Sequence, residues 1–135
     1  MMSQDFCLRL AIPSDAPRLA DFNCRLAWET EAKRLNESTV LQGVGRVLED
    51  SSEGFYTVIE VEGEVVAQAL ITYEWSDWRN GLVWWIQSVY VRPEFRGQGL
   101  FKALYAFVKD DCKARDECNW KFQREPKCQR IDIAP

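Results

Sequence analysis

The sequence of 135 residues contains no histidine, and its five cysteines are scattered without a Cys-x-x-Cys pair. Zinc sites of the Cys/His type, Ser-His-Asp triads and Cys-His dyads all need residues or spacings that are missing here. We therefore expect no metal site, and we expect the cysteines to be reduced and mostly buried. Any catalysis has to use carboxylates, tyrosines, backbone amides or a bound cofactor.

Long apolar runs are also missing. No stretch approaches the roughly 20 residues that span a membrane, and the N-terminal residues lack the apolar core of a signal peptide. The 17 basic and 21 acidic residues give a formal charge of −4, which argues against broad binding to nucleic acid or anionic membrane. We expect one cytoplasmic domain with a hydrophobic core, because 47% of the residues are hydrophobic.

The N-terminal part of the sequence predicts one strand and two helices. Apolar residues alternate over residues 6–12, as in a half-buried strand. Ser14 is placed to cap a helix that runs to about Trp28. A second helix follows Asn36, because the apolar residues after it recur at helical spacing.

The middle of the sequence predicts three strands and a third helix. Residues 55–61 and 64–75 read as a hairpin that turns at Glu62-Gly63. Residues 82–91, LVWWIQSVYV, are apolar on both faces, as in a strand that is covered on both sides. An amphipathic helix follows over residues 99–113. The order of strand, helix, helix, three strands and helix indicates a single α/β domain without internal repeats.

Two glycines and an arginine separate the last apolar strand from the third helix, in the segment SVYVRPEFRGQGLFKALYAFV of residues 88–108. A helix N-terminus carries unpaired N–H groups and the positive end of the helix dipole, so it attracts anions. Gly97 and Gly99 leave room near those amides, and Arg96 adds a permanent charge. A G-x-G-x-x-G motif would need glycine at Lys102, and no P-loop is present. The segment predicts either a diphosphate cradle or a tight turn without a ligand.

The run R-G-Q-G-L-F-K-A-L, directly after V-Y-V-R-P-E-F, resembles the acetyl-CoA-binding motif Q/R-x-x-G-x-G/A of the GCN5-related N-acetyltransferase (GNAT) family. Arg96 and Gly99 match the motif, whereas Phe101 stands where the family usually has glycine or alanine. The similarity covers about residues 5–113 and includes ETE, EWSDWRNG and WWIQSVYV. It implies the GNAT fold, an α/β fold with a mixed, mostly antiparallel sheet flanked by helices.

The resemblance also implies acetyl-CoA as the co-substrate and assigns residues to it. The strand end at Val89, Tyr90 and Val91 would offer backbone groups to the pantetheine arm. The loop and the first turn of the helix would hold the diphosphate, and this group comprises Arg96, Gly97, Gln98, Gly99, Leu100, Phe101 and Lys102.

The implied reaction is the direct attack of a primary amine, on a small molecule or a peptide, on the thioester in a ternary complex. The family's chemistry uses a carboxylate base, a proton donor that is often tyrosine, and a backbone N–H, here near Val89, that polarises the carbonyl. Candidate bases are Glu29 and Glu31 at the end of the first helix, and Glu74 and Asp77 near the end of the third strand. The alternative reading for each carboxylate is a solvated surface charge.

Two other features have two readings each. Gln87 lies in an otherwise apolar strand, so its amide either forms hydrogen bonds in the core or contacts the substrate. Four tryptophans crowd one region and form either core or the lining of an acceptor pocket: Trp75, Trp78, Trp84 and Trp85.

The C-terminal part departs most from the family. Relatives continue after the third long helix with another strand, a helix that carries the tyrosine general acid, and a closing hairpin. After Ala114 this chain offers only a short strand at residues 130–134, so the C-terminal strands are missing and the general acid is unassigned. Tyr90 and Tyr105 are the alternatives for it. We expect residues 1–115 to form the acetyl-CoA-binding domain and residues 116–135 to form a divergent tail.

The missing strands bear on assembly and on activity. Without them the strand over residues 82–91 becomes an open apolar edge, which predicts a homodimer through that edge, with residues 130–134 as a short covering strand. Three functional readings follow. The chain is an active N-acetyltransferase, a non-catalytic or decayed acyl-CoA-binding relative, or a self-associating fragment with neither property.

Overall fold

A computed structural model describes the backbone of residues 6–114, 118–124 and 128–132, and the side chains of residues 6–113. Two 3₁₀ turns, Pro13–Asp15 and Pro93–Phe95, precede α1 and α3. The helices and strands are, in chain order, β1 (Cys7–Leu10), α1 (Ala16–Glu31), α2 (Glu37–Glu49), β2 (Gly54–Val61), β3 (Glu64–Ser76), β4 (Gly81–Val91), α3 (Leu100–Ala114), β5 (Cys118–Arg124) and β6 (Cys128–Asp132).

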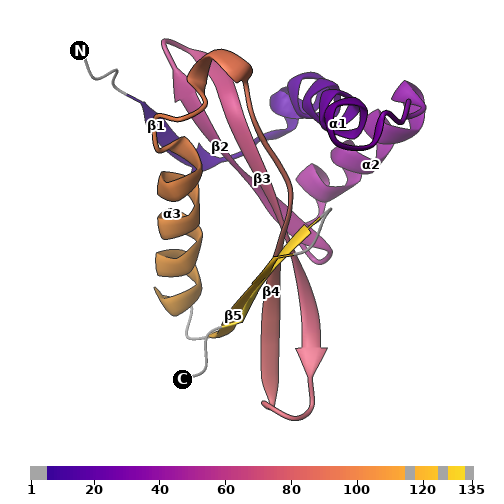
Figure 1. The fold of residues 1–135 in the computed structure, drawn as a ribbon. Helices are drawn as coiled ribbons and strands as arrows, with labels where there is room; N and C mark the ends of the chain where they lie inside the picture. The colour runs from indigo at the N-terminus through magenta and orange to yellow at the C-terminus, as the bar shows by residue number, and fades with distance from the viewer. Residues whose placement is uncertain (1–5, 115–117, 125–127, 133–135) are drawn as a thin grey trace.

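The described strands form one sheet in the order β1-β2-β3-β4-β5-β6, with a further pairing of β4 with β6. Only the β4–β5 pair is parallel, and the other described pairs are antiparallel. Helices α1 and α2 cover one face of the sheet and α3 covers the other (Figure 1). The expected α/β fold, a mixed and mostly antiparallel sheet flanked by helices, is confirmed.

The turns and caps follow from local sequence, with one exception. Glu62 and Gly63 have φ angles of 53° and 81°, the left-handed pair that a tight two-residue hairpin turn requires. The Asn36 side chain accepts a hydrogen bond from the first turn of α2, as an N-cap does. The expected N-cap at Ser14 is wrong, because a 3₁₀ turn occupies this segment. The carboxylate of Asp15 instead accepts hydrogen bonds from Arg9.

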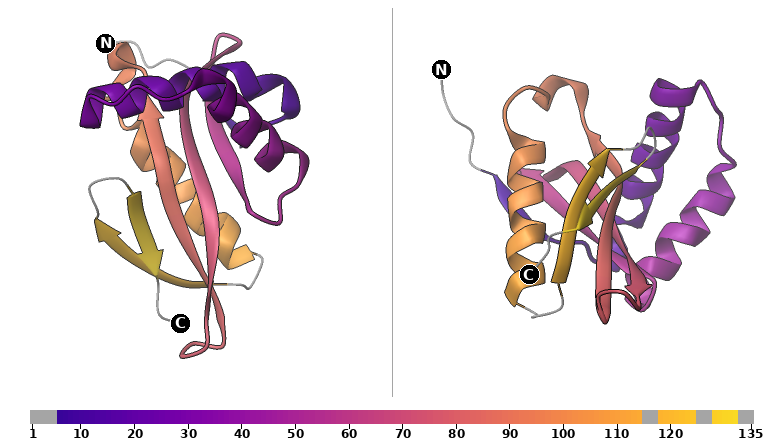
Figure 2. Two further views of the ribbon diagram at one scale, coloured as in Figure 1. Left: turned by 90° about the vertical axis from the view of Figure 1, so that its right-hand side faces the viewer. Right: turned by 60° about the horizontal axis from the view of Figure 1, so that its bottom comes forward.

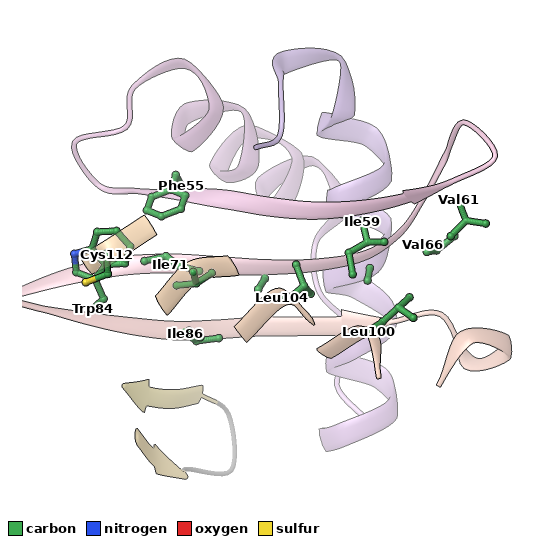
Figure 3. Packing of buried hydrophobic residues seen from close by; sticks show 13 residues of the cluster. Phe55, Ile59, Val61, Val66, Ile71, Trp84, Ile86, Leu100, Leu104 and Cys112 are labelled. Atoms are coloured by element: carbon green, nitrogen blue, oxygen red, sulfur yellow. The ribbon is translucent and has the colours of Figure 1, made fainter. Parts of the chain in front are cut away.

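Two hydrophobic clusters lie on the two faces of the sheet. The larger one packs the sheet against Leu100 and Leu104 of α3, and it contains Trp84 (Figure 3). The smaller one packs Phe22 of α1 and Val44 of α2 against the opposite face. β4 contributes to both clusters, so its two apolar faces are explained by helices on both sides.

The expectation that residues 82–91 form an open edge is wrong for the first half of this strand. β5 pairs with Leu82 and Val83, and β6 pairs with residues 84–87. Two short strands therefore lie in the region where strands were expected to be missing. The expected strand at 130–134 overlaps β6, and residues 133 and 134 lie outside the described part of the chain. Among the described strands, none pairs with residues 88–91 on this side of β4.

The cysteines meet the sequence expectation only in part. Cys7 and Cys24 are free thiols, but Cys7 is exposed and Cys24 is half-buried. Cys112 is fully buried, yet it is disulfide-bonded, which corrects the expectation of reduced thiols at that position. Over the described ranges, no helix is long and apolar enough to cross a membrane. No group of three or more potential metal ligands forms among the same residues.

Candidate functional site

A cleft of about 360 Å³ lies where α1, the end of β4 and the start of α3 meet. All three lie at the end of the sheet where β4 ends (Figures 1 and 2). The lining residues are Leu26, Glu29, Thr30, Val89, Tyr90, Val91, Phe95, Arg96, Gly97, Gly99, Leu100, Phe101 and Lys102. Every residue that the sequence assigns to acetyl-CoA is in this set except Gln98, whose side-chain amide donates to the Glu94 carbonyl (3.1 Å).

The glycine loop of the cleft has the backbone that an anion cradle needs. Gly97 and Gly99 have φ angles of 78° and 85°, in the left-handed region that favours glycine. A Cβ atom added at either position would meet no atom within 4 Å, so the backbone angle rather than crowding requires glycine. The first intrahelical hydrogen bond of α3 runs from the Ala103 amide to the Gly99 carbonyl (3.0 Å).

The amides of Leu100, Phe101 and Lys102 have no intrahelical acceptor, because they precede the first bond of the helix. These three residues line the cleft, and the space in front of the neighbouring glycines is open. Main-chain donors at the positive end of a helix dipole suit a phosphate group. The residues present therefore fit the diphosphate of a nucleotide cofactor.

Arg96 contacts the protein more closely than the sequence suggests. Its Nε donates to the Val91 carbonyl (2.7 Å), and its Nη2 donates to Glu29 Oε1 (2.8 Å). Its guanidinium carbon lies 5.2 Å from the centroid of the Tyr90 ring. Arg96 thus ties the end of β4 to the end of α1, and its charge is balanced by Glu29.

Glu29 and Tyr90 form a proton donor–acceptor pair in the cleft. The Tyr90 hydroxyl donates to Glu29 Oε2 (2.8 Å). The hydrogen bond from Arg96, followed by that from Tyr90, lowers the pKa of Glu29. Burial, followed by the hydrogen bond to Glu29, raises the pKa of Tyr90, which is 2% exposed. Of the two alternative proton donors, Tyr90 lies in the cleft, whereas Tyr105 packs near Phe101 and is not among the lining residues.

Arg96→Ala should raise the pKa of Glu29 toward its ordinary value of 4.5, because it removes the largest cause of the depression. A carboxyl group whose pKa is lowered in the folded state stabilises the fold at pH values above its ordinary pKa. This stabilisation is lost as the pH falls through the lowered pKa. A carbon-13 NMR titration of labelled glutamate carboxyls measures the change. Arg96→Lys, which retains a cation, serves as the control and should shift the pKa less. An unchanged Glu29 titration in Arg96→Ala would contradict the assignment.

The other candidate bases lie outside the cleft. Glu31 is the last residue of α1 and is exposed. It follows Glu29 by two residues, a rotation of about 200° around the helix axis, so it lies on the opposite side of the helix. Glu74 is exposed near the far end of the β3–β4 hairpin, where its carboxylate accepts from Trp85 Nε1 (2.8 Å). Asp77 is exposed in the turn between these strands. Of the four candidate bases, the structure therefore brings only Glu29 to the cleft that the glycine loop lines.

Gln87 and the tryptophans, which the sequence assigned either to the core or to substrate contact, also lie outside the cleft. The Gln87 amide donates to the Thr72 hydroxyl of the neighbouring strand, which favours a role within the sheet. Trp84 is fully buried in the larger hydrophobic cluster. Trp75 and Trp78 are 61% and 95% exposed, toward the end of the β3–β4 hairpin that projects past the other strands (Figure 2).

Sequence reasoning missed three lining residues, Leu26, Thr30 and Phe95. Leu26 and Thr30 lie three residues before and one residue after Glu29, on the same side of α1. The helical spacing around Glu29 was the available signal. Phe95 lies in the turn between β4 and the glycine loop, where no periodic pattern marks it.

The chain is similar to known acetyltransferases. The family model described as acetyltransferase (GNAT) family matches residues 18–124. A possible acetyltransferase from Clostridium difficile 630 is 45% identical, with a TM-score of 0.76 over 80% of this chain and 71% of that chain. No protein of curated function matches the sequence.

Two more distant solved structures share the fold. An integron cassette protein from the mobile metagenome of Cole Harbour Salt Marsh is 24% identical, with a TM-score of 0.76 over 82% of this chain and 72% of that chain. A predicted acetyltransferase from Clostridium acetobutylicum, solved with acetyl-CoA, is 18% identical, with a TM-score of 0.70 over 84% and 77% of the two chains. The family match spans most of the sequence and includes the cleft. The chain therefore belongs to the GNAT acetyltransferase family.

Proposed function

We propose that this protein is an N-acetyltransferase that moves the acetyl group of acetyl-CoA to a primary amine on a small molecule or a peptide. The observation that carries the proposal is the shared cleft. The helix-start amides of the glycine loop and the Glu29–Tyr90 pair line the same space, so an anion site and a proton-transfer site are adjacent.

The residues of the cleft divide into two groups by chemistry. The amides of Leu100, Phe101 and Lys102 would bind the diphosphate. Residues 88–91 have no strand partner on their outer side among the described strands, so their backbone groups would bind the pantetheine arm. Bound acetyl-CoA supplies a thioester whose carbonyl carbon an amine attacks.

Glu29 is the proposed base, and Tyr90 is the proposed proton donor. Glu29 would accept the proton of the incoming ammonium, directly or through water, and thereby produce the neutral amine. The Tyr90 hydroxyl, whose ordinary pKa of 10 is raised further by burial, is protonated at neutral pH and would donate its proton to a departing thiolate. If Arg96 turns toward the diphosphate, Glu29 loses the main cause of its lowered pKa and becomes a stronger base.

Gly99→Ala tests the cofactor site, with CoA binding measured by isothermal titration calorimetry. An alanine in the left-handed conformation is strained by about 1–2 kcal/mol, so the free loop should leave this conformation, and CoA should bind about 10-fold more weakly because binding has to restore it. Gly43→Ala on α2 is the matched control, since its backbone is helical and it should leave CoA binding unchanged. Failure of the wild type to bind CoA would overturn the proposed function. Equal binding by both variants would exclude a role for the Gly99 backbone.

Acyl-CoA binding without catalysis is the second candidate function. One observation favours it, because both carboxylate oxygens of Glu29 are already engaged, one by Arg96 and one by Tyr90. Thiol release from acetyl-CoA over a panel of primary amines separates the two. Release above the uncatalysed rate supports transfer, whereas CoA binding without release supports the second candidate.

The remaining expectations stay predictions. The predicted homodimer now depends on residues 88–91, the part of β4 that no described strand pairs with on its outer side, and the same edge is proposed for the pantetheine arm. The division into residues 1–115 and a tail over residues 116–135 is still proposed, although β5 and β6 of the tail pair with β4 in the same sheet. Cytoplasmic location and the lack of nucleic-acid and membrane partners are inferred only from composition and charge.

A further inference from the structure

The inner side of the cleft contains an irregularity in β4. Gln68 lies opposite Tyr90 and Leu70 lies opposite Gln87, so β4 has one more residue than β3 between these pairs. Such a bulge turns the local peptide groups out of the regular ladder. Ser88, within the bulge, has a φ of 53°, a left-handed conformation that is unfavourable for a residue other than glycine.

A buried hydrogen-bond network holds this bulge. Gln68 Nε2 donates to the Ser88 carbonyl (2.8 Å) and to Asn23 Oδ1 (2.8 Å). Asn23 Nδ2 donates to the Tyr56 hydroxyl (2.9 Å). Gln68 is 0% exposed, and its partners come from α1 and β4, with β2 reached through Asn23. The position of the Ser88 carbonyl is thus linked to helix α1.

The orientation of the Gln68 amide follows from its neighbours. A flipped amide would place Oε1 against two acceptors, the Ser88 carbonyl and Asn23 Oδ1. In the observed orientation, Oε1 is buried and has no hydrogen-bond partner among the described residues. An unpaired buried acceptor is unfavourable, because it has lost its hydrogen bonds to water without replacement. Two unfavourable features, this acceptor and the left-handed Ser88, therefore coincide at one peptide, as they often do at functional sites.

The hydrogen bond to Ser88 also sets the direction of the next amide. The peptide is trans, so its C=O and N–H groups point in opposite directions. Because the Ser88 carbonyl points at Gln68, the Val89 N–H points away from Gln68. Val89 lines the cleft, and no described strand pairs with it on the outer side of β4.

We propose that Gln68 is a positioning residue that fixes the Ser88–Val89 peptide, so that the Val89 N–H is presented to the thioester oxygen of the bound acyl-CoA. The proposal rests on the proposed function. A fixed N–H donor stabilises the negative charge that develops on that oxygen during amine attack. Asn23 holds Gln68 from α1, the helix that also carries Glu29, so the proposed donor and the proposed base share one support.

The sequence allows a direct spectroscopic test, because Ser88-Val89 is its only Ser-Val dipeptide. Labelling serine with carbon-13 at the carbonyl and valine with nitrogen-15 gives a single carbonyl–amide cross-peak for this peptide. Gln68→Leu should move the Ser88 carbonyl and Val89 amide shifts. The matched control is Thr57→Val, which removes another fully buried polar group, one whose hydroxyl contacts the Ala69 carbonyl instead. It should leave the cross-peak near its wild-type position.

Kinetics give the second readout. Gln68→Leu should lower kcat about 10- to 100-fold. This decrease is no larger than the decrease in kcat that follows from removing an oxyanion donor itself. The dissociation constant of CoA should change much less than kcat, because the proposed hydrogen bond to the thioester oxygen strengthens only as charge develops. If Gln68→Leu does not fold, Asn23→Ala replaces it as the test. Asn23 is only half-buried and accepts a hydrogen bond from Gln68, so its substitution should shift the same cross-peak and lower kcat.

The two proposals fail in different ways. An unmoved cross-peak in Gln68→Leu, or a kcat equal to that of Thr57→Val, overturns the positioning role of Gln68. A wild type that binds no CoA and transfers no acetyl group overturns the proposed function, and a moved cross-peak would then still support control of the Ser88–Val89 peptide by Gln68.

Discussion

Glu29→Gln should lower the kcat of acetyl transfer about 10²- to 10³-fold, because it removes the only candidate base that lines the cleft among the described residues. The substitution keeps the size of the side chain and an oxygen that can accept from Tyr90. It also removes the carboxylate that pairs with Arg96. CoA should therefore bind at least as tightly as to the wild type, since the guanidinium no longer has to leave an ion pair. Steady-state kinetics and calorimetry measure the two effects.

The matched control is Glu31→Gln on the same helix. Glu31 is exposed and is not among the lining residues, so its substitution should leave both kcat and CoA affinity unchanged. An equal loss of activity in the two variants would point to a general effect of charge rather than to a base. A Glu29→Gln variant with a normal kcat would exclude Glu29 as the base. Glu29 would then be only a lining residue of the acyl-CoA-binding cleft.

Features that depend on neighbouring residues could be predicted from the sequence. The turn at Glu62-Gly63 and the cap at Asn36 each depend on a few adjacent residues. The left-handed glycines of the loop after β4 belong to the same class, because the need for positive φ at Gly97 and Gly99 is local. Ser14 does not cap α1 because Pro13–Asp15 forms a 3₁₀ turn, in which the carboxylate of Asp15 accepts hydrogen bonds from Arg9 of β1 and from the Ile12 amide.

Features that depend on distant residues could not be predicted in the same way. Glu29 pairs with Tyr90 and Arg96, more than sixty positions later in the chain. No spacing rule links these residues, so Glu29, Glu31 and Glu74 were equivalent as sequence candidates. The network of Gln68 has the same character, because its partners lie on three other elements.

The strands at the end of the chain show a different limit. The segment Cys118–Arg124 alternates apolar Cys118, Trp120 and Phe122 with polar residues, a half-buried-strand pattern that the polar character of the surrounding sequence obscured. Its pairing with β4 uses backbone groups, which the sequence pattern does not report. The open edge was expected along residues 82–91 because the C-terminal strands of the family were judged to be missing, and β5 and β6 pair with residues 82–87 instead.

Trp84→Ala should lower the free energy of unfolding by about 3–5 kcal/mol, the usual cost of removing a large buried aromatic side chain. Trp84 is 0% exposed and lies in the core with Phe55 (Figure 3). Its ring centroid is 5.3 Å from that of Phe55 and 5.7 Å from that of Tyr73. Because small domains have only about 5–15 kcal/mol of stability, the variant should unfold at a much lower urea concentration.

Trp78→Ala is the matched control, since it makes the same chemical change in the turn that joins β3 to β4. Trp78 is 95% exposed, so its loss should alter the free energy of unfolding by less than about 0.5 kcal/mol. Similar unfolding curves for the two variants would contradict the placement of Trp84 in the core. The pair also decides between the two readings of the tryptophans. A Trp78→Ala protein that keeps its stability but loses transfer to amines would place Trp78 at the acceptor, whereas unchanged transfer would leave it as an exposed side chain of the hairpin.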